Sequence, residues 1–359
     1  MMSSMVASRN SRLLASFSRL SGRPRLFSVF LASSNLTRCV ATLQQRPQHV
    51  VLLNKKIPIG HQNTECAACL STSSGERASL LVSADYVANR LKENADNFVL
   101  LHCTQAVDEA DYKEMHIAGA RCFNIFACKD NTSPYKNMLP TDEAFARYVS
   151  LLGVCNDDEV VVYDAKLDEP NVQYACKVWN MFRIFGHDRC SVLDGGLALW
   201  LEQNRPVAGS MAVGKRQFAA RYRPELVTDF ERVTANIDGG GEVQVTDSRA
   251  PAAYQGLKSP KGMPIGHIRY SVNVPKGEKL DGTSKRFKSV EELRALFADR
   301  GLDLQKPLVA SCGTGTTANS TVFAAALCGK HDVQLYDGSF DEFRQRVSDA
   351  SHLKTGPEP

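Results

Sequence analysis

The chain has 359 residues, and 43% of them are apolar, which suits two ordinary domains of about 150 residues each. No stretch approaches the ~20 apolar residues of a membrane-spanning helix, so we expect no membrane segment. Residues 1–64 hold nine Lys or Arg and no Asp or Glu, so the net charge of +4 belongs to them and the remainder has no basic excess for binding nucleic acid.

The N-terminal residues 1–77 have the composition of a tail outside the fold. They are rich in Arg and Ser, and the first part can form a basic amphipathic helix with Arg9, Arg12, Arg19, Leu13, Leu14, Phe17 and Leu20. Such a segment is typical of a mitochondrial transit peptide. The alternative is a disordered basic tail without a targeting role. We therefore expect a mitochondrial protein, with the cytoplasm as the second choice.

After the tail, short apolar strands alternate with helical stretches. The first half predicts strands at Phe98–His102 and Val160–Asp164, and helices at Asp142–Leu152 and Tyr174–Phe185. The second half predicts strands at Glu242–Asp247 and Leu308–Ser311, and helices at Ser289–Arg300 and Thr317–Cys328. This alternation indicates an α/β fold with mostly parallel sheets flanked by helices. Ligands of such folds bind beyond the C-terminal ends of the strands.

Three landmarks recur in the same order with steady spacing. In the first landmark, H-I-A-G-A (116–120) leads to F-N-I (123–125), and G-H-I (266–268) leads to V-N-V-P (272–275). In the second, E-V-V-V-Y-D (159–164) matches P-L-V-A-S-C (307–312), and in the third S-V-L-D-G-G (191–196) matches V-Q-L-Y-D-G (333–338). The chain therefore reads as two copies of one domain. We expect domain 1 at residues 79–205, a polar, flexible linker at 206–224 and domain 2 at 225–350.

Cys312 ends a predicted strand and opens the small-residue loop Gly313, Thr314, Gly315, Thr316 and Thr317 before a predicted helix. Glycines let the loop amides turn inward, and a helix start offers unpaired N–H groups, so the loop suits a nucleophilic thiolate. The alternative is a buried structural cysteine. The matching residue of domain 1 is Asp164, so only domain 2 can use sulfur chemistry. The other cysteines bring the total to an odd eleven, irregularly spaced, which indicates reduced thiols.

Several long motifs resemble the tandem rhodanese-domain sulfurtransferases, in particular the 3-mercaptopyruvate sulfurtransferase branch, over about Ser79 to Phe343. They are T-S-P-Y-K-N-M-L-P (132–140), V-W-N-M-F-R-I-F-G-H (178–187), S-V-L-D-G-G-L-A-L-W (191–200), D-S-R-A (247–250), P-L-V-A-S-C-G-T-G-T-T-A (307–318) and Y-D-G-S-F (336–340). The resemblance implies two rhodanese-like domains, of which only the second is catalytic.

The resemblance also implies the reaction. Cys312 would take a sulfane sulfur from a small donor and pass the persulfide sulfur to cyanide or to a thiol such as thioredoxin or glutathione, without metal or cofactor. The loop amides from Gly313 to Thr317 would stabilise the thiolate and the persulfide. Thiosulfate-preferring members carry basic side chains after the cysteine, whereas this loop is neutral. We therefore expect 3-mercaptopyruvate rather than thiosulfate as the donor; the alternative is that the neutral loop only serves the turn.

The chain departs from the family at the residues that bind the donor. A substrate-binding Arg of the family falls on Ala253, and the second falls in a shortened loop where Lys261 is the nearest cation. Lysine offers a point charge in place of a bidentate fork. The substrate-binding candidates are therefore Lys261 and Arg249, with Lys258 as a further cation nearby. For Arg249, pairing with Asp247 or support of the Cys312 loop is the favoured interpretation.

The family's proton relay is also changed. Its His falls on Asn137 and its Asp on Phe126, so that only the loop hydroxyl of Thr314 is retained. A neutral Asn is no general base. An active sulfurtransferase with altered donor use remains the favoured hypothesis. The alternative is a catalytically weakened persulfide carrier or protein-interaction module. A phosphatase is disfavoured, because its loop needs an Arg where Ala318 stands.

Other polar and aromatic residues have structural interpretations. His116 and His267 occupy equivalent turns, which favours a structural role over catalysis. Trp179 and Trp200 are expected in cores or at the domain interface. Lys177 and Arg183 share one predicted helix and are expected to be solvated, with a place at the cleft as the alternative. Asp164 is expected to be a strand-end residue.

Overall fold

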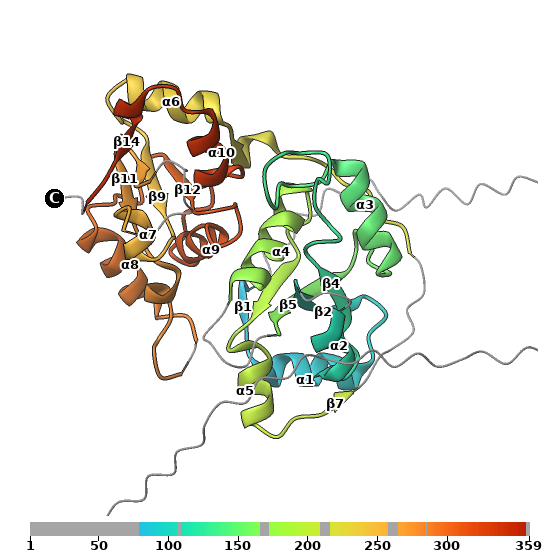
Figure 1. Cartoon of the computed structure of the whole chain (residues 1–359). Helices are drawn as coiled ribbons and strands as arrows, with labels where there is room; N and C mark the ends of the chain where they lie inside the picture. Colours follow the sequence, from blue (N-terminus) through green and yellow to red (C-terminus); the bar gives the residue numbers. More distant parts are fainter. Residues whose placement is uncertain are drawn as a thin grey trace, which may run out of the picture. The chain divides into compact units, whose positions relative to one another are not determined.

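The computed structural model describes residues 79–105, 109–165, 172–208, 216–257, 265–284 and 286–356. The expected tail at 1–77 lies outside these residues. The first domain is built on a five-stranded sheet in which all pairings are parallel (Figure 1). Its strands, in spatial order, are β1 (Leu81–Val82), β6 (Cys190–Leu193), β5 (Glu159–Asp164), β2 (Phe98–Thr104) and β4 (Arg121–Asn124).

Helices cover both faces of this sheet, because its strands are apolar on both sides. Leu100 of β2 packs with residues of α1 (Ala84–Glu93) and α5 (Gly196–Glu202). The neighbouring Leu101 packs on the opposite face, with residues of α3 (Asp142–Leu151) and α4 (Gln173–Ile184). The short helix α2 (Ala110–Glu114) follows β2. The alternation of side chains along β2 thus explains the two helical layers.

The second domain repeats this design. Its parallel strands, in spatial order, are β11 (Ser271–Asn273), β9 (Gln244–Asp247), β12 (Leu308–Ser311), β13 (Gln334–Tyr336) and β8 (Val227–Thr228). Residues of α6 (Phe230–Asp238) and α10 (Ser339–Arg346) pack on one face, and residues of α8 (Val290–Asp299) and α9 (Asn319–Leu327) on the other. The remaining helices are α7 (Pro251–Tyr254) and the 3-10 turns η2 (Pro224–Leu226), η3 (Lys276–Lys279) and η4 (Ala350–His352).

The predicted α/β fold of two repeated domains is confirmed by the strand order. Both sheets have the same order of equivalent strands, read from opposite edges. Each domain also has an antiparallel pair: β3 (His116–Ile117) with β7 (Val207–Ala208), and β10 (His267–Ile268) with β14 (Leu353–Lys354).

The two histidines have the structural role that their positions predicted. His116 stacks on Tyr112 with ring centroids 3.9 Å apart, and its Nδ1 lies 2.8 Å from the Tyr112 carbonyl oxygen. His267 repeats this arrangement on Tyr254, at 3.7 Å and 2.9 Å. Both imidazoles are buried. The same stack therefore fixes the same turn in each domain.

The eight predicted helices and strands are all present, with bounds within a few residues. Side chains at the helix starts explain why the helices begin there. Thr141 accepts a hydrogen bond from the Ala144 amide at the start of α3, and Ser289 and Glu292 form a capping box at the start of α8. Asp164 lies at the end of β5, where its carboxylate accepts hydrogen bonds from the Tyr174 and Ala175 amides of α4. Its expected strand-end role is confirmed.

Helices α4 and α9 join the two domains through a shared apolar core. The rings of Trp179 on α4 and Phe323 on α9 meet edge to face, with centroids 4.8 Å apart. Beside them the Asn180 amide donates to Asn319 Oδ1 over 2.8 Å. Trp200, by contrast, packs in the core of domain 1 and donates its indole N–H to the Pro206 carbonyl. Both tryptophans thus have the core or interface positions that we expected.

The expectation that Lys177 and Arg183 are solvated is wrong. Lys177 is 1% exposed and Arg183 is 8% exposed, because α4 is buried along its whole length between domain 1 and α9. The Arg183 guanidinium lies over the Trp179 ring and donates to the His331 carbonyl of domain 2. Periodicity within α4 cannot reveal this, since the helix is covered on all sides.

The described part of the expected linker is attached to domain 1. Phe218 is buried and its amide donates to Ser150 Oγ over 2.9 Å. The Arg221 amide donates to the Phe185 carbonyl over 2.9 Å, and the Arg223 guanidinium forms a bidentate pair with Asp188 at 2.7 Å. Residues 216–223 therefore differ from the flexible tether that their polarity suggested.

None of the helices among the described residues is long and apolar enough to span a bilayer.

We expect the Trp179–Phe323 contact to couple the stability of the two domains. Trp179→Ala and Phe323→Ala should each lower the free energy of unfolding by about 3–5 kcal/mol, because each leaves a cavity in the shared core. Their coupling energy should be about 1 kcal/mol, since the rings touch. Denaturant unfolding of both single variants and the double variant measures these values. Leu151→Ala, at an exposed position of α3, is the control with little effect. Strict additivity would contradict the coupling.

Candidate functional site

Cys312 lies directly after β12, in the middle of the second sheet, and its thiol is 1% exposed. The ends of β9, β11 and β12 meet here, because parallel strands bring their carboxyl ends to one edge of the sheet. The prediction that Cys312 lies at the end of a strand is confirmed. A cavity opens at this edge.

The cavity has a volume of about 580 Å³ and is lined by both domains. Domain 2 supplies the strand-end segments after β9, β11 and β12. Domain 1 supplies the residue after β2, the segment around Asn137 and the start of α4. The lining residues are Gln105, Asn137, Gln173, Tyr174, Ser248, Arg249, Ala250, Pro251, Ala253, Pro275, Lys276, Gly277, Cys312, Gly313, Thr314, Thr316 and Thr317.

The loop from Gly313 to Thr317 presents a row of unsatisfied backbone donors beside the thiol. None of its amides donates a hydrogen bond to another residue of the described chain. Its carbonyls, by contrast, are held: Gly313 accepts from the Asp341 amide over 2.8 Å, and Asn319 Nδ2 donates to Gly315 over 2.9 Å. A loop that is fixed through its carbonyls and keeps its amides unused is suited to bind an anion.

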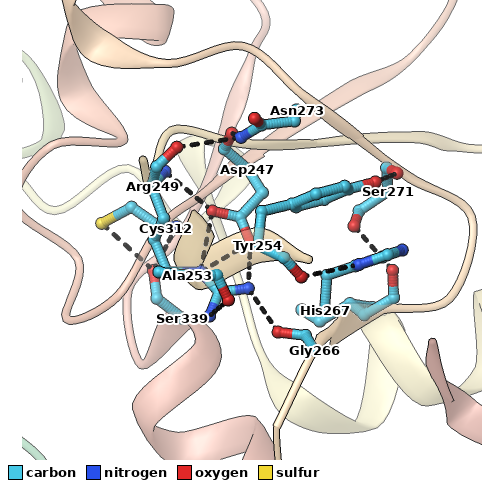
Figure 2. Close-up of polar contacts among 11 residues, drawn as sticks. Asp247, Arg249, Ala253, Tyr254, Gly266, His267, Ser271, Asn273, Cys312 and Ser339 are labelled. Carbon is cyan, nitrogen blue, oxygen red and sulfur yellow. Dashed lines mark hydrogen bonds and ion pairs between the residues drawn. The ribbon is translucent and has the colours of Figure 1, made fainter. Parts of the chain in front are cut away.

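Ser339 holds the backbone of Cys312 in place. Its Oγ accepts a hydrogen bond from the Cys312 amide over 3.1 Å and donates to the Tyr336 carbonyl over 2.7 Å. The same Oγ lies 3.9 Å from Cys312 Sγ, as Figure 2 shows. Ser339 has a φ of 50°, in the left-handed region that ordinary residues rarely adopt. Ser339 lies in the motif Y-D-G-S-F (336–340), but the sequence did not predict it as a site residue.

Asn137 meets the loop from domain 1. Its Nδ2 lies 3.0 Å from Thr314 Oγ1 and 3.3 Å from Thr316 Oγ1. The motif match that placed Asn137 opposite the loop hydroxyl therefore agrees with the geometry. Phe126 lies 40% exposed, with the Lys129 ammonium over its ring. The amide thus orients the two loop hydroxyls and supplies no base.

Arg249 is engaged by the protein itself (Figure 2). Its guanidinium donates to both carboxylate oxygens of Asp247, at 2.6 to 3.1 Å, and to the Gly266 carbonyl at 2.8 Å. The group also lies 3.9 Å from the centroid of the Phe340 ring. This is the pairing with Asp247 that the sequence favoured. The other predicted substrate-binding cation, Lys261, and the nearby Lys258 lie outside the described residues.

No sequence motif predicted that Lys276 and Gln173 would line the cavity. Lys276 follows Pro275 at the start of η3, and its Nζ lies 3.4 Å from Gln173 Oε1 at the start of α4. Both line the cavity, although 103 residues separate them. Ala253, where the family carries Arg, lines the same cavity. Only the folded arrangement of both domains brings this lysine to the site.

A buried lysine holds the loop against domain 1. Lys177 Nζ donates to the Asn137 carbonyl over 2.8 Å and to the Gly315 carbonyl over 3.3 Å. Burial lowers the pKa of Lys177, while the neighbouring Asp337 and Cys312 oppose this. Burial likewise raises the pKa of Asp337, against the opposing effect of Lys177. The alternative interpretation of Lys177 as a residue of the cleft region is therefore the one that agrees with the structure.

A second buried lysine lies in η3. Lys279 is fully buried, and its Nζ donates to the Val274 and Pro275 carbonyls over 2.7 and 3.3 Å. Burial lowers the pKa of Lys279 to about 7, and Glu278, Cys176 and Cys312 only partly offset the effect. Within the described ranges, no group of three His, Cys, Asp or Glu side chains is arranged to hold a metal ion.

Both domains are similar to known proteins. Residues 83–203 and 229–346 match the family described as "Rhodanese-like domain". Thiosulfate sulfurtransferase of Gallus gallus is 43% identical over 238 residues, covering 66% of this chain and 81% of the relative. The 3-mercaptopyruvate sulfurtransferase of Rattus norvegicus is 39% identical over 287 residues, covering 77% and 95%.

Among solved structures, the 3-mercaptopyruvate sulfotransferase SseA of Escherichia coli has a TM-score of 0.66 and 31% identity, covering 73% of this chain and 99% of SseA. The chain belongs to the rhodanese family. It is a tandem rhodanese-domain sulfurtransferase, an enzyme that transfers sulfur-containing groups.

Gly315 is the position where the loop tolerates no side chain. Its φ is +68°, and an added Cβ would lie 2.1 Å from the Asp337 carbonyl oxygen. We expect Gly315→Ala to cost about 2 kcal/mol or more of stability and to abolish sulfur transfer, since the loop must leave the Lys177 contact. Gly313→Ala is the matched control, because its nearest neighbour would be Arg249 Cδ at 3.9 Å. Thermal unfolding and turnover measure both, and equal behaviour of the two variants would refute the expectation.

The lowered pKa of Lys279 predicts that the stability of the protein depends on pH. Its folded pKa of about 7 lies below the unfolded value of about 10.4, so the unfolded chain binds more protons between these values. Stability should therefore rise with pH from about 7 to about 10, by on the order of 4 kcal/mol for this group. Lys279→Met should be more stable than the wild type at pH 7 and should lack this rise.

Unfolding midpoints at pH 7 and pH 9 test the prediction for Lys279. Lys306→Met, which removes an exposed lysine of the same domain, should keep the wild-type pH dependence. The attribution to Lys279 fails if Lys279→Met and Lys306→Met show the same change between the two pH values.

Proposed function

We propose that this sulfurtransferase moves a sulfane sulfur from a small anionic donor through a persulfide on Cys312 to a thiol acceptor or cyanide. The observation that carries the proposal is the row of unused amides from Gly313 to Thr317 around a cysteine at the wall of a cavity. Such donors stabilise a thiolate before the reaction and a persulfide anion after it. A structural cysteine would not need them.

The transfer needs no external oxidant. The Cys312 thiolate attacks the donor sulfur, an S–S bond forms, and the bond from that sulfur to the rest of the donor breaks. With 3-mercaptopyruvate the electron pair leaves on the pyruvate enolate, which takes up a proton; with thiosulfate it leaves on sulfite. The acceptor then attacks the outer sulfur of the persulfide, and the electron pair returns to Cys312 as the thiolate. This is covalent catalysis in two half-reactions.

The charge of the site favours 3-mercaptopyruvate over thiosulfate. The loop after Cys312 consists of Gly and Thr residues and has no charged side chain, so a dianion would lack cationic partners there. The sequence relatives include enzymes named for either donor, at 43% and 39% identity, so their names do not decide the matter. The neutral loop and the paired guanidinium of Arg249 support the donor with the single carboxylate.

Acceptor and location follow from the same chemistry and from the tail. A low-molecular-weight thiol such as glutathione, or the exposed thiol of thioredoxin, is the acceptor that the persulfide mechanism favours. The Arg- and Ser-rich, acid-free residues 1–64 support import into mitochondria. The second candidate is a persulfide carrier that is loaded by a partner protein, because Asn137 provides no general base at the loop hydroxyl.

The first test is direct detection of the persulfide. The full chain and its Cys312→Ser variant are incubated with 3-mercaptopyruvate or with thiosulfate, and intact mass is recorded. We expect the wild type to gain one sulfur atom, more readily from 3-mercaptopyruvate, and Cys312→Ser to gain none. Cys155→Ser, which removes a partly exposed thiol away from the cavity, is the control that should load like the wild type.

Three outcomes separate the hypotheses. Equal loading of Cys312→Ser would show that sulfur is carried elsewhere. Faster loading from thiosulfate would overturn the donor preference alone. A folded wild type that loads from neither donor would refute the enzyme mechanism with small donors and favour the carrier that receives its sulfur from a protein.

A further inference from the structure

We propose that Lys279 is a positioning residue whose buried ammonium stabilises the thiolate of Cys312, and afterwards its persulfide anion, from inside domain 2. This inference rests on the proposed function of Cys312. It assigns part of the activation of the thiol to a charge that lies outside the loop from Gly313 to Thr317.

Lys279 lies near the strand end that carries Cys312. Its Nζ donates to the Val274 and Pro275 carbonyls over 2.7 and 3.3 Å, and these two residues follow β11 directly. Strand β9 lies between β11 and β12 and pairs in parallel with both. Since neighbouring strands are about 4.8 Å apart, the ends of β11 and β12 are about 10 Å apart. Val274 and Cys312 also belong to one buried core, so protein and not water fills the space around them.

The hydrogen bonds of Lys279 hold its ammonium in place without neutralising it. The side chain is fully buried, and within the described ranges its Nζ donates to carbonyl oxygens only. The neighbouring carboxylate of Glu278 is paired with the Arg300 guanidinium at 2.6 Å. A buried charge without an ionic partner lowers the stability of a fold. A residue with this cost beside a reactive group is typical of a functional site.

The groups that act electrostatically on Lys279 leave one anion to compensate its charge. Burial lowers the pKa of Lys279 most, and Arg300 at the end of α8 lowers it further. Glu278, Cys176 of α4 and Cys312 raise it. Glu278 and Arg300 form their own ion pair, and burial raises the pKa of the Cys176 thiol well above its ordinary value, which keeps that thiol neutral. The thiolate of Cys312 is therefore the partner that the buried ammonium stabilises.

The effect of this ammonium on Cys312 has a predictable size and pH range. Two unit charges about 10 Å apart in a partly polar interior change a protonation equilibrium by on the order of 10-fold. Lys279 transfers no atom and no proton in the reaction, so the balance of the two half-reactions is unchanged. Its charge is present below its pKa of about 7 and is lost above it. The stabilisation of the thiolate is therefore greatest on the acid side of neutral pH.

The first test measures the thiolate without depending on sulfur transfer. The full chain and its Lys279→Met variant are alkylated with neutral iodoacetamide at pH 6 and pH 9, and the Cys312 peptide is followed by mass. We expect Lys279→Met to react about 10-fold more slowly at pH 6, because the share of thiolate falls with the loss of the charge. The two rates should converge at pH 9, where the wild-type lysine is neutral.

Lys330→Met is the matched control for this measurement. Lys330 is also largely buried in domain 2, at 8% exposure, but its ammonium is paired with Asp332 at 2.9 Å. We expect Lys330→Met to react like the wild type at both pH values. The stability of Lys279→Met at pH 7 separates an electrostatic role from a structural one. Reactivity that falls while stability rises supports the inference, whereas a loss of both, at pH 6 and pH 9 alike, would overturn it.

A second measurement uses a variant that keeps the packing around Lys279. Coupling between two titrating groups is reciprocal, so removal of the Cys312 thiolate must change the titration of Lys279. We expect Lys279, followed by NMR in protein with ¹³C-labelled lysine, to titrate about one pH unit lower in Cys312→Ser than in the wild type. The same titration in both proteins would overturn the inference, whether or not Lys279→Met folds.

The outcomes distinguish this inference from the proposed function. Equal alkylation of the wild type and a folded Lys279→Met at pH 6 would overturn the role of Lys279, even if Cys312 forms its persulfide. Slower alkylation at pH 6 with convergence at pH 9 would support it, even in a wild type that forms no persulfide from either donor. In that second case the coupling of the two groups stands and the proposed sulfur transfer falls.

Discussion

The Cys312 loop depends on one buried ammonium. Lys177 of domain 1 donates to the carbonyls of Asn137 and Gly315, so a buried ammonium sets the curvature of the loop after Cys312. A buried charge without partners would cost several kcal/mol, and it therefore holds both carbonyls in place. Gly315 completes the fit, because any side chain there would collide with Asp337. In this arrangement the loop carbonyls accept hydrogen bonds from the protein. The loop amides donate to no other described residue and can therefore bind a ligand.

The two copies of the domain carry different side chains at the end of the equivalent strand, Asp164 in domain 1 and Cys312 in domain 2. The carboxylate of Asp164 caps α4 at the end of β5, where the equivalent strand of domain 2 ends in the thiol of Cys312. Domain 1 thus uses its strand end to fix α4, and α4 carries Trp179, Asn180 and Lys177 toward domain 2. Domain 1 thus lines the cavity beside Cys312 and supports the loop of domain 2. This division explains why α4 is buried along nearly its whole length.

The departures from the family have a consistent electrostatic meaning. Asn137 keeps the position opposite the loop hydroxyls and replaces a titratable ring by a neutral amide, so the geometry is retained and the base is lost. Ala253 and Lys276 both line the cavity, although they come from different segments of domain 2. The cysteine and its loop are thus retained, while the polar side chains around them differ from the family pattern.

The repeat, the parallel sheets and the position of Cys312 at a strand end could be predicted from the sequence, because they follow from local patterns: apolar strands, capped helices and a small-residue loop. It also placed Asn137 opposite Thr314 and Arg249 beside Asp247. Only the tertiary structure decided the burial of Lys177 and Arg183, the anchoring of residues 216–223 and the arrival of Lys276 and Gln173 at one cavity. The physical reason is distance along the chain. Burial and charge at the site arise from contacts between segments that are 40 to 138 residues apart, and no local periodicity predicts which segments will meet.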